Sequence, residues 1–222
     1  MNERISEMNS ILEDLYYSTS NMNMELTNKT VYSYLVRRNV SMNDLGKKIN
    51  FVFYSNQSNE WENFFGRWIE KFKNVDNIDV FCSENWKYFC QFKNGQVTGL
   101  DFVKVYIPLD YEHIYEGVNR IFNFLAKSNI AHCSKVSSDI RFDDVVVRLN
   151  NLEDAKKLQN FVDNDRYIQK GLMKPNAFTI SNNKVAYAYD GGLSYNSCVA
   201  KIIAVILIVV LKIKMLALRI LI

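Results

Sequence analysis

Hydrophobic residues recur at helical spacing over the first third of the chain. In "ISEMNSILEDLYY" the apolar positions Ile5, Met8, Ile11, Leu12 and Leu15 follow at spacings of 3, 3, 1 and 3, a helical stripe, and "TVYSYLVRRNV" continues a helical or mixed pattern, so residues 5–40 are expected to be helical. The aromatic segment "WENFFGRWIEKF" repeats in the same way through Trp61, Phe64, Phe65, Trp68, Ile69 and Phe72. A stripe of this kind is typical of a helix face that packs into the core.

From about Val80 the period shortens to two, which predicts strands. Strand patterns cover "DVFCS" and "KYFCQFKNGQVTGLDFVKVYIPL", and the Asn94-Gly95 pair within the latter predicts a hairpin. Helical stripes follow in "DYEHIYEGVNRIFNFLAKSN", with Asp110 as N-cap, and in "NLEDAKKLQNFVDN", with Asn151 as N-cap. The segments "HCSKV", "RFDDVVVRL" and "KVAYAYD" read as strands.

The order of elements from residue 102 to 190 is therefore β-α-β-β-α-β, the succession of ferredoxin-like folds. We expect an α+β protein in which an N-terminal helical part packs on a mixed or antiparallel sheet. The expected parts are a helical segment over 1–78, an α+β domain over 79–200 and a hydrophobic tail over 201–222.

The tail "KIIAVILIVVLKIKMLALRILI" differs in composition from everything before it. About 20 apolar residues are long enough for a transmembrane helix. However, Lys212 and Lys214 fall in mid-span, where each would cost roughly 2.5–3.5 kcal/mol. As a membrane-surface helix the tail lacks a polar face, since four cations are its only polar groups. The third interpretation, favoured by the abrupt change, is out-of-frame sequence in place of the natural C-terminus.

The net charge of +3 lies in this tail. Residues 201–222 carry four cations and no acid, so the other 200 residues sum to 3 − 4 = −1. A nearly neutral body gives no electrostatic case for nucleic acid. Four dispersed cysteines and two histidines argue against a zinc site, and no cofactor is expected. Without a secretory signal at the N-terminus we expect a cytoplasmic protein, membrane-associated if the tail is native.

The stretch "HCSKVSSDIRFDDVVVRL" (His132–Leu149) carries unusual charges for a sheet segment. As a phosphate-handling set, Lys135 and Arg141 would bind the anion, Lys135 could act as a base, and His132 could protonate a leaving group. Asp143 or Asp144 could orient Arg141; by strand alternation Asp143 shares its face and Asp144 does not. Alternation also places His132 and Lys135 on opposite faces. The alternative is a solvent-facing hairpin with its charges paired across strands.

Several segments together resemble the HopA family of type III secretion effectors, which has relatives in gene clusters for lanthipeptides and thioamitides. The similar segments are "ILEDLYYSTSN", "INFVFYSNQSNEWENFFGRWI", the Lys135, Arg141, Asp143, Val146 block, and "KPNAFTISNNKVAYAYDGGLSYNSCVAKI". In this last run Tyr195-Asn196 and Val199-Ala200 replace the family's glycine and terminal arginine, and "GRW" interrupts its Gly-Trp pair.

The resemblance implies an effector-like or peptide-tailoring protein. For the biosynthetic relatives it implies a phospho-Ser/Thr lyase that acts on a peptide or protein beside a kinase-like partner. Such β-elimination needs a base, a phosphate clamp and an acid, and the match favours Lys135 and Arg141 for these roles. Two alternatives are a non-catalytic interaction module that uses the aromatic N-terminal half, and a protein anchored to a membrane through residues 202–222.

Overall fold

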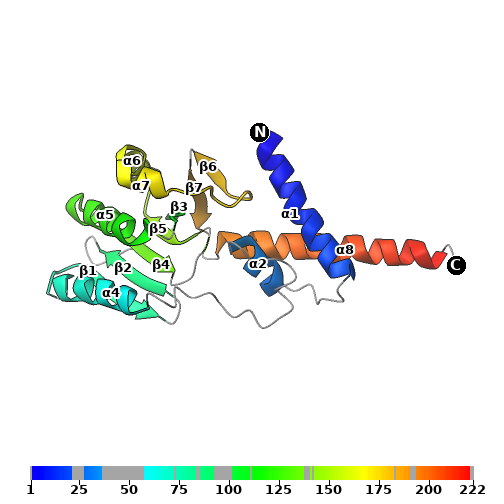
Figure 1. Cartoon of the computed structure of the whole chain (residues 1–222), viewed down its shortest axis with the longest axis horizontal. Helices are drawn as coiled ribbons and strands as arrows, with labels where there is room; N and C mark the ends of the chain where they lie inside the picture. The colour runs from blue at the N-terminus through cyan, green and yellow to red at the C-terminus, as the bar shows by residue number, and fades with distance from the viewer. Residues whose placement is uncertain are drawn as a thin grey trace. The chain divides into compact units, whose positions relative to one another are not determined.

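The computed structural model describes residues 2–21, 28–36, 58–72, 74–83, 86–92, 102–110, 112–137, 141, 143–182, 184–190 and 194–220 (Figure 1). The chain forms two compact units. One comprises residues 51–192, and the other combines residues 1–50 with 193–222. The aromatic helix therefore belongs with the sheet, whereas the expected division placed it in the N-terminal part.

The unit of residues 51–192 is built on seven described strands. They are β1 (Ile78–Ser83), β2 (Trp86–Gln91), β3 (Phe102–Ile107), β4 (His132–Ser137), β5 (Val145–Leu149), β6 (Ile180–Asn182) and β7 (Val185–Asp190). Their order in the sheet is β1-β2-β4-β5-β3-β7-β6, and every neighbouring pair is antiparallel. Within it, β4-β5-β3-β7 is the strand order that a split βαβ succession produces. The α+β class is confirmed, and β3, α5, β4, β5, α6 and β7 follow the expected β-α-β-β-α-β order, with α7 and β6 inserted between α6 and β7.

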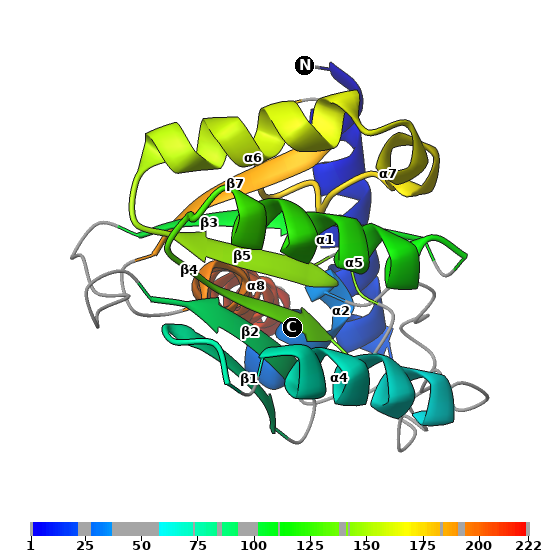
Figure 2. The ribbon, with the colours of Figure 1, turned by 90° about the vertical axis from the view of Figure 1, so that its left-hand side faces the viewer.

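One face of this sheet is covered by α4 (Ser58–Phe72), α5 (Ile114–Lys127) and α6 (Leu152–Asn164), as Figure 2 shows. The aromatic stripe predicted for α4 does pack into the core, where Trp68 contacts the rings of Phe72, Phe89 and Phe122 at centroid distances of 5.0, 5.2 and 5.6 Å. Alternate residues of the central strands complete this core, among them Val105, Ile107, Val136, Val145, Val147 and Leu149.

The hairpin expected at Asn94-Gly95 is wrong. The pair itself lies outside the described residues, but the two flanking strands are not partners, because β2 bonds to β1 and β4 whereas β3 bonds to β5 and β7. The hairpin that does form joins β1 to β2. The short helix α7 (Arg166–Gly171) and the strand β6 were not expected.

Helix caps agree with expectation in one case of two. Asn151 caps α6, since its side-chain oxygen accepts a hydrogen bond from the backbone N of Asp154 at 2.8 Å. The N-cap of α5 is His113 rather than Asp110. Asp110 instead accepts a hydrogen bond from the backbone N of His113, at 2.9 Å, and pairs with its ring Nδ1, at 2.7 Å.

The second unit contains α1 (Asn2–Asn21), α2 (Asn28–Val36) and the long α8 (Tyr195–Ile220). α2 packs against α8, and the hydroxyl of Tyr34 in α2 donates to Asp14 of α1 at 3.0 Å. Helices thus cover most of residues 5–36 as predicted, while residues 37–40 lie outside the described part. Among the described helices, α8 is the one whose length and composition would allow it to cross a membrane, over Tyr195–Lys214.

Candidate functional site

The connection between β4 and β5 is held by backbone and carboxylate contacts. The backbone N of Ser137 donates to the carbonyl of Asp144 at 2.9 Å, and the Asp144 carboxylate accepts from the backbone N of Arg141. Asp144 is fully buried, so this carboxylate fixes the main chain at Arg141 instead of facing solvent. The strand predicted from Arg141 onward starts at Val145.

Arg141 and Asp143 form a buried two-point ion pair. The Arg141 Nε lies 2.7 Å from Asp143 Oδ1, and Nη2 lies 3.4 Å from Oδ2. Both side chains are more than 90% buried. Of the two aspartates considered from the sequence, Asp143 is the one that orients the guanidinium, and the solvent-facing hairpin is excluded for these residues.

Trp86 brings Lys135 and Arg141 together. The pairing of β2 with β4 sets Trp86 opposite Ser137 and Tyr88 opposite Lys135, on the sheet face turned away from α5. Lys135 Nζ lies 3.8 Å from the centroid of the Trp86 ring, and Arg141 Cζ lies 5.0 Å from it. Both cations therefore share one indole, an arrangement that cation–π attraction stabilises.

The surroundings of Lys135 lower the pKa of its amine. Burial lowers the pKa of Lys135 below its ordinary value of 10.5, and the charges of Arg141 and Lys104 lower it further, while Asp143 opposes them. Lys104 faces Arg148 in the register of β3 and β5, and Arg148 faces Cys133 in that of β4 and β5. The face therefore gathers four basic side chains, of which Lys104, Arg141 and Arg148 suit it to bind an anion even where Lys135 is neutral.

His132 does not join this group. It lies on the opposite face of β4, fully buried, with its ring 5.1 Å from that of Phe89. Nδ1 is 2.8 Å from the Ser134 hydroxyl. Burial lowers the pKa of His132 to about 3, so the ring is neutral at physiological pH. The alternation that the sequence indicated holds, because no bulge reverses it in β4.

Two cysteines occupy neighbouring positions on the cationic face. Cys90 and Cys133 are opposite each other in the register of β2 and β4, and both are free thiols. The hydrogen bond from Cys90 lowers the pKa of Cys133, and the charges of Arg148 and Lys135 lower it further. The same hydrogen bond raises the pKa of Cys90. The sequence pattern marks neither cysteine as reactive.

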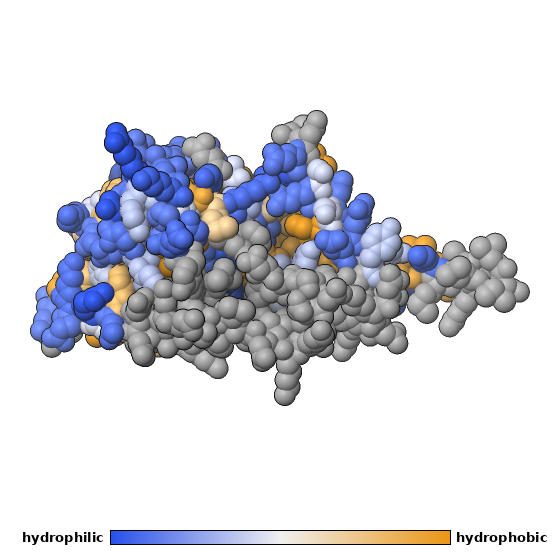
Figure 3. All heavy atoms as spheres, viewed as in Figure 1, coloured by the Kyte–Doolittle hydropathy of each residue, from blue (hydrophilic) through white to orange (hydrophobic). Residues whose placement is uncertain are grey.

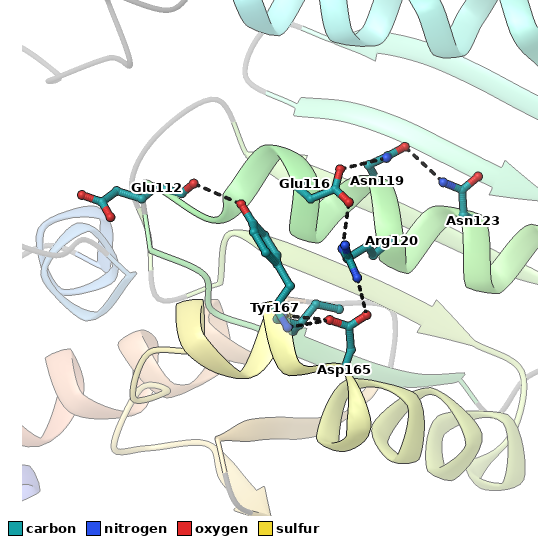
Figure 4. A network of polar contacts seen from close by, with 8 residues as sticks. Glu112, Glu116, Asn119, Arg120, Asn123, Asp165 and Tyr167 are labelled. Carbon is teal, nitrogen blue, oxygen red and sulfur yellow. Dashed lines mark hydrogen bonds and ion pairs between the residues drawn. The ribbon is translucent and has the colours of Figure 1, made fainter.

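A separate polar network lies on the helix-covered side and serves to attach α7 (Figure 4). Asp165 caps α7 by accepting from the backbone N of Tyr167 and Ile168 at 2.9 and 3.0 Å. Arg120 of α5 bridges it to Glu116, at 3.2 Å from Asp165 and 2.7 Å from Glu116. Every member has a structural role as a cap or tie, so the network is not a candidate for catalysis.

Three members of the cationic face were missed from the sequence. Lys104 and Arg148 interrupt otherwise apolar strands, "FVKVYI" and "VVVRL", and this interruption was a usable signal. Trp86 gave no such signal, because only the pairing of β2 with β4 brings it to Lys135. Among the described residues no group of three or more His, Cys, Asp or Glu side chains could hold a metal ion.

Comparison with known proteins supports the fold. No protein-family model matches the sequence, and no curated protein matches it. The solved structure of an effector protein from Pseudomonas syringae pv. syringae strain 61 is similar, with a TM-score of 0.55 and 12% identity over 88% of this chain and 84% of that chain. An effector protein from Pseudomonas syringae pv. tomato strain DC3000 aligns with a TM-score of 0.39 and 12% identity, over 88% and 70%. The first similarity shows a shared fold.

Proposed function

We propose that the chain is an effector-like or peptide-tailoring protein that eliminates phosphate from phosphoserine or phosphothreonine in a peptide or protein. The observation that carries the proposal is the convergence of Lys135 and Arg141 on the Trp86 ring, next to the buried Arg141–Asp143 pair. The fold shared with a Pseudomonas syringae effector protein supports the effector-like role.

Arg141 is the proposed phosphate ligand. Its guanidinium has five N–H donors in a planar fork, of which Nε and Nη2 bind the Asp143 carboxylate, and this fork has the geometry that bidentate recognition of phosphate uses. Because Asp143 fixes the plane of the guanidinium, the donors are oriented before the substrate arrives. Pre-oriented donors stabilise developing charge at little reorganisation cost.

Lys135 is the proposed base. In its neutral form it would remove the α-proton of the phosphorylated residue, and the released electron pair would form the Cα–Cβ double bond. The Cβ–O bond breaks at the same time, and inorganic phosphate leaves with that bond's electrons. The lowered pKa of Lys135 increases the fraction of the amine in the neutral state that this step requires.

Protonation of the leaving group by His132 is not part of this proposal. The ring lies on the other face of β4, and with a pKa of about 3 its imidazolium form, the one that acts as a general acid, is not populated at neutral pH. The cations themselves take that role, since Arg141, Lys104 and Arg148 can stabilise the negative charge of departing phosphate. A kinase-like partner that supplies the phosphorylated substrate, and action in the cytoplasm, belong to the same proposal.

The decisive experiment incubates the full chain with phosphoserine and phosphothreonine peptides and follows loss of the elements of phosphoric acid by mass spectrometry. Lys135→Ala should lower the rate at least ~100-fold, the usual contribution of a positioned base. Arg141→Lys keeps the positive charge but loses the planar set of N–H donors, so it should weaken binding of the phosphopeptide. Lys170→Ala, an exposed lysine on α7, is the matched control. A folded protein without product would overturn the lyase and favour a non-catalytic interaction module.

A further inference from the structure

The helix α8 has two unlike faces within its own unit. Ala200, Ile203, Ala204 and Leu207 are buried, and α2 packs against the helix. Eight other apolar side chains that the structure describes are exposed, most by about half or more; they are Ile202, Val205, Ile206, Ile208, Val209, Val210, Ile213 and Leu216. Figure 3 shows hydrophobic side chains at the surface of α8 on both sides of its crossing with α1. A continuous apolar stripe of this size marks a contact surface.

Cations border this stripe. Lys201 and Lys212 are both exposed and stand eleven residues apart, which is close to three helical turns, so they lie on the same flank of α8. No aspartate or glutamate occurs between Gly191 and Ile222. An apolar stripe with cations along its edge and no acid nearby complements a surface of anionic lipids.

We propose that the exposed face of α8 binds in the plane of a membrane that contains anionic lipids, with the helix axis parallel to the surface. The stripe would enter the boundary between headgroups and acyl chains, and Lys201 and Lys212 would contact the headgroups. The polar face that the isolated sequence of α8 lacks is supplied by the fold, because α1 and α2 cover the other side of the helix. This inference does not depend on the proposed elimination chemistry.

The packing of this unit argues for the in-plane arrangement over a spanning one. To cross a bilayer, α8 would have to give up its contacts with α2 and the approach of Lys214 Nζ to the Tyr16 ring of α1, at 5.3 Å. α1 and α2 carry polar residues such as Asp14 and Tyr34, which are bonded to each other and unsuited to the hydrocarbon core. In-plane binding keeps the unit intact.

A second copy of the chain fits the stripe less well than lipid does. A symmetric pair of α8 helices would bring the lysine-bordered stripes together, and α8 offers no carboxylate to neutralise them. The phosphate and carboxylate groups of phosphatidylserine headgroups would neutralise the same lysines. Self-association is therefore the competing outcome of the test.

The test is flotation of the full chain with vesicles of phosphatidylcholine alone and of phosphatidylcholine mixed equally with phosphatidylserine. The chain should float with the mixed vesicles, bind them more weakly in high salt and be released by an alkaline wash. Ile206→Asn with Ile213→Asn should reduce binding at least ~100-fold, as expected when two large aliphatic side chains no longer enter the apolar phase. Lys201→Gln with Lys212→Gln should reduce it roughly 25-fold on anionic vesicles, from about a fivefold loss per lysine.

Ile180→Asn is the matched control, since Ile180 is an equally exposed isoleucine in β6 and its loss should leave flotation unchanged. Circular dichroism verifies that each variant is folded. Resistance to the alkaline wash would overturn the in-plane arrangement in favour of a spanning helix. If the folded chain does not float, and light scattering shows a dimer that the Ile206→Asn, Ile213→Asn variant does not form, the proposal of lipid binding is wrong. The stripe would then bind a second copy of the chain.

Discussion

Arg141 and Asp143 are joined at two points inside the protein, with Nε 2.7 Å from Oδ1 and Nη2 3.4 Å from Oδ2. Both side chains are removed from solvent, so each charge relies on the other. In water such a pair would contribute little, but in a buried setting the loss of one partner leaves a charge without compensation. The pair therefore holds the proposed phosphate ligand in place and is a point of vulnerability for the fold.

Truncating one member of this pair should destabilise the protein more than removing both. We expect Asp143→Leu and Arg141→Met each to cost about 3–5 kcal/mol of unfolding free energy, and the double variant with both substitutions to recover much of that loss while abolishing phosphate binding. Urea unfolding of the two single variants and the double variant gives the coupling energy. Glu153→Ala, which breaks the exposed pair with Lys157, is the control and should cost far less than either single variant of the buried pair. Additive losses at Arg141 and Asp143 would refute the coupling.

The sequence predicted the longer helices and the central strands because their signals are local, whereas the short α7 and β6 were missed. The aromatic stripe of α4, the stripes of α5 and α6 and the Asn151 cap each depend on residues within a few positions of one another. Alternation within β4 likewise separates His132 from Lys135, because successive side chains of a strand point to opposite faces. Each of these inferences concerns a period or a cap within one element.

Strand pairing is where the sequence misled. An Asn-Gly pair is a strong turn signal, yet β2 pairs with β4, whose first residue is His132, and not with the next strand in the chain. This pairing buries Phe89 against the helices and places Trp86 beside Lys135. Since Trp86 and Lys135 are far apart in sequence, no local pattern could report that they share a site.

His132 should make the protein sensitive to acid. Its pKa is about 3 in the folded protein, against 6.5 when unfolded, so the unfolded chain binds the extra proton throughout that interval. The His132 contribution is fully present above about pH 6.5 and is lost as pH falls, by at most about 1.4 kcal/mol per pH unit. Urea unfolding between pH 7 and 4 should show a shallower decline for His132→Asn, which can retain a bond to Ser134. The same variant should leave the pH profile of elimination unchanged, whereas a change would restore His132 as a candidate acid.

Two glycines should respond in opposite ways to alanine. A Cβ on Gly171 would lie 2.2 Å from the Cβ of His113, and the backbone there is fixed because Asp110 N donates to the Gly171 carbonyl at 2.8 Å. Gly171→Ala should therefore cost about 1–3 kcal/mol. Gly66, in the exposed part of α4, would meet nothing within 4 Å, so Gly66→Ala should stabilise the helix by up to about 1 kcal/mol. Thermal unfolding of both variants measures the difference, and equal effects would mean that α7 can shift away from His113.

The charges around Lys135 should be visible in the pH profile of elimination. If neutral Lys135 removes the α-proton, the rate rises with pH through the pKa of Lys135, which burial and its cationic neighbours place below 10.5. Lys104→Gln removes one of those cations, so the pKa should rise and the rising limb should move to higher pH. Asp143→Asn removes the opposing carboxylate and should move the limb to lower pH.

Rates measured from pH 6 to 10 on phosphoserine peptides test both directions, with Lys156→Gln on the exposed face of α6 as the control for a change in total charge. A limb that stays in place in both variants, although Lys135→Ala abolishes the reaction, would show that Lys135 acts by binding phosphate, and that the base is another group.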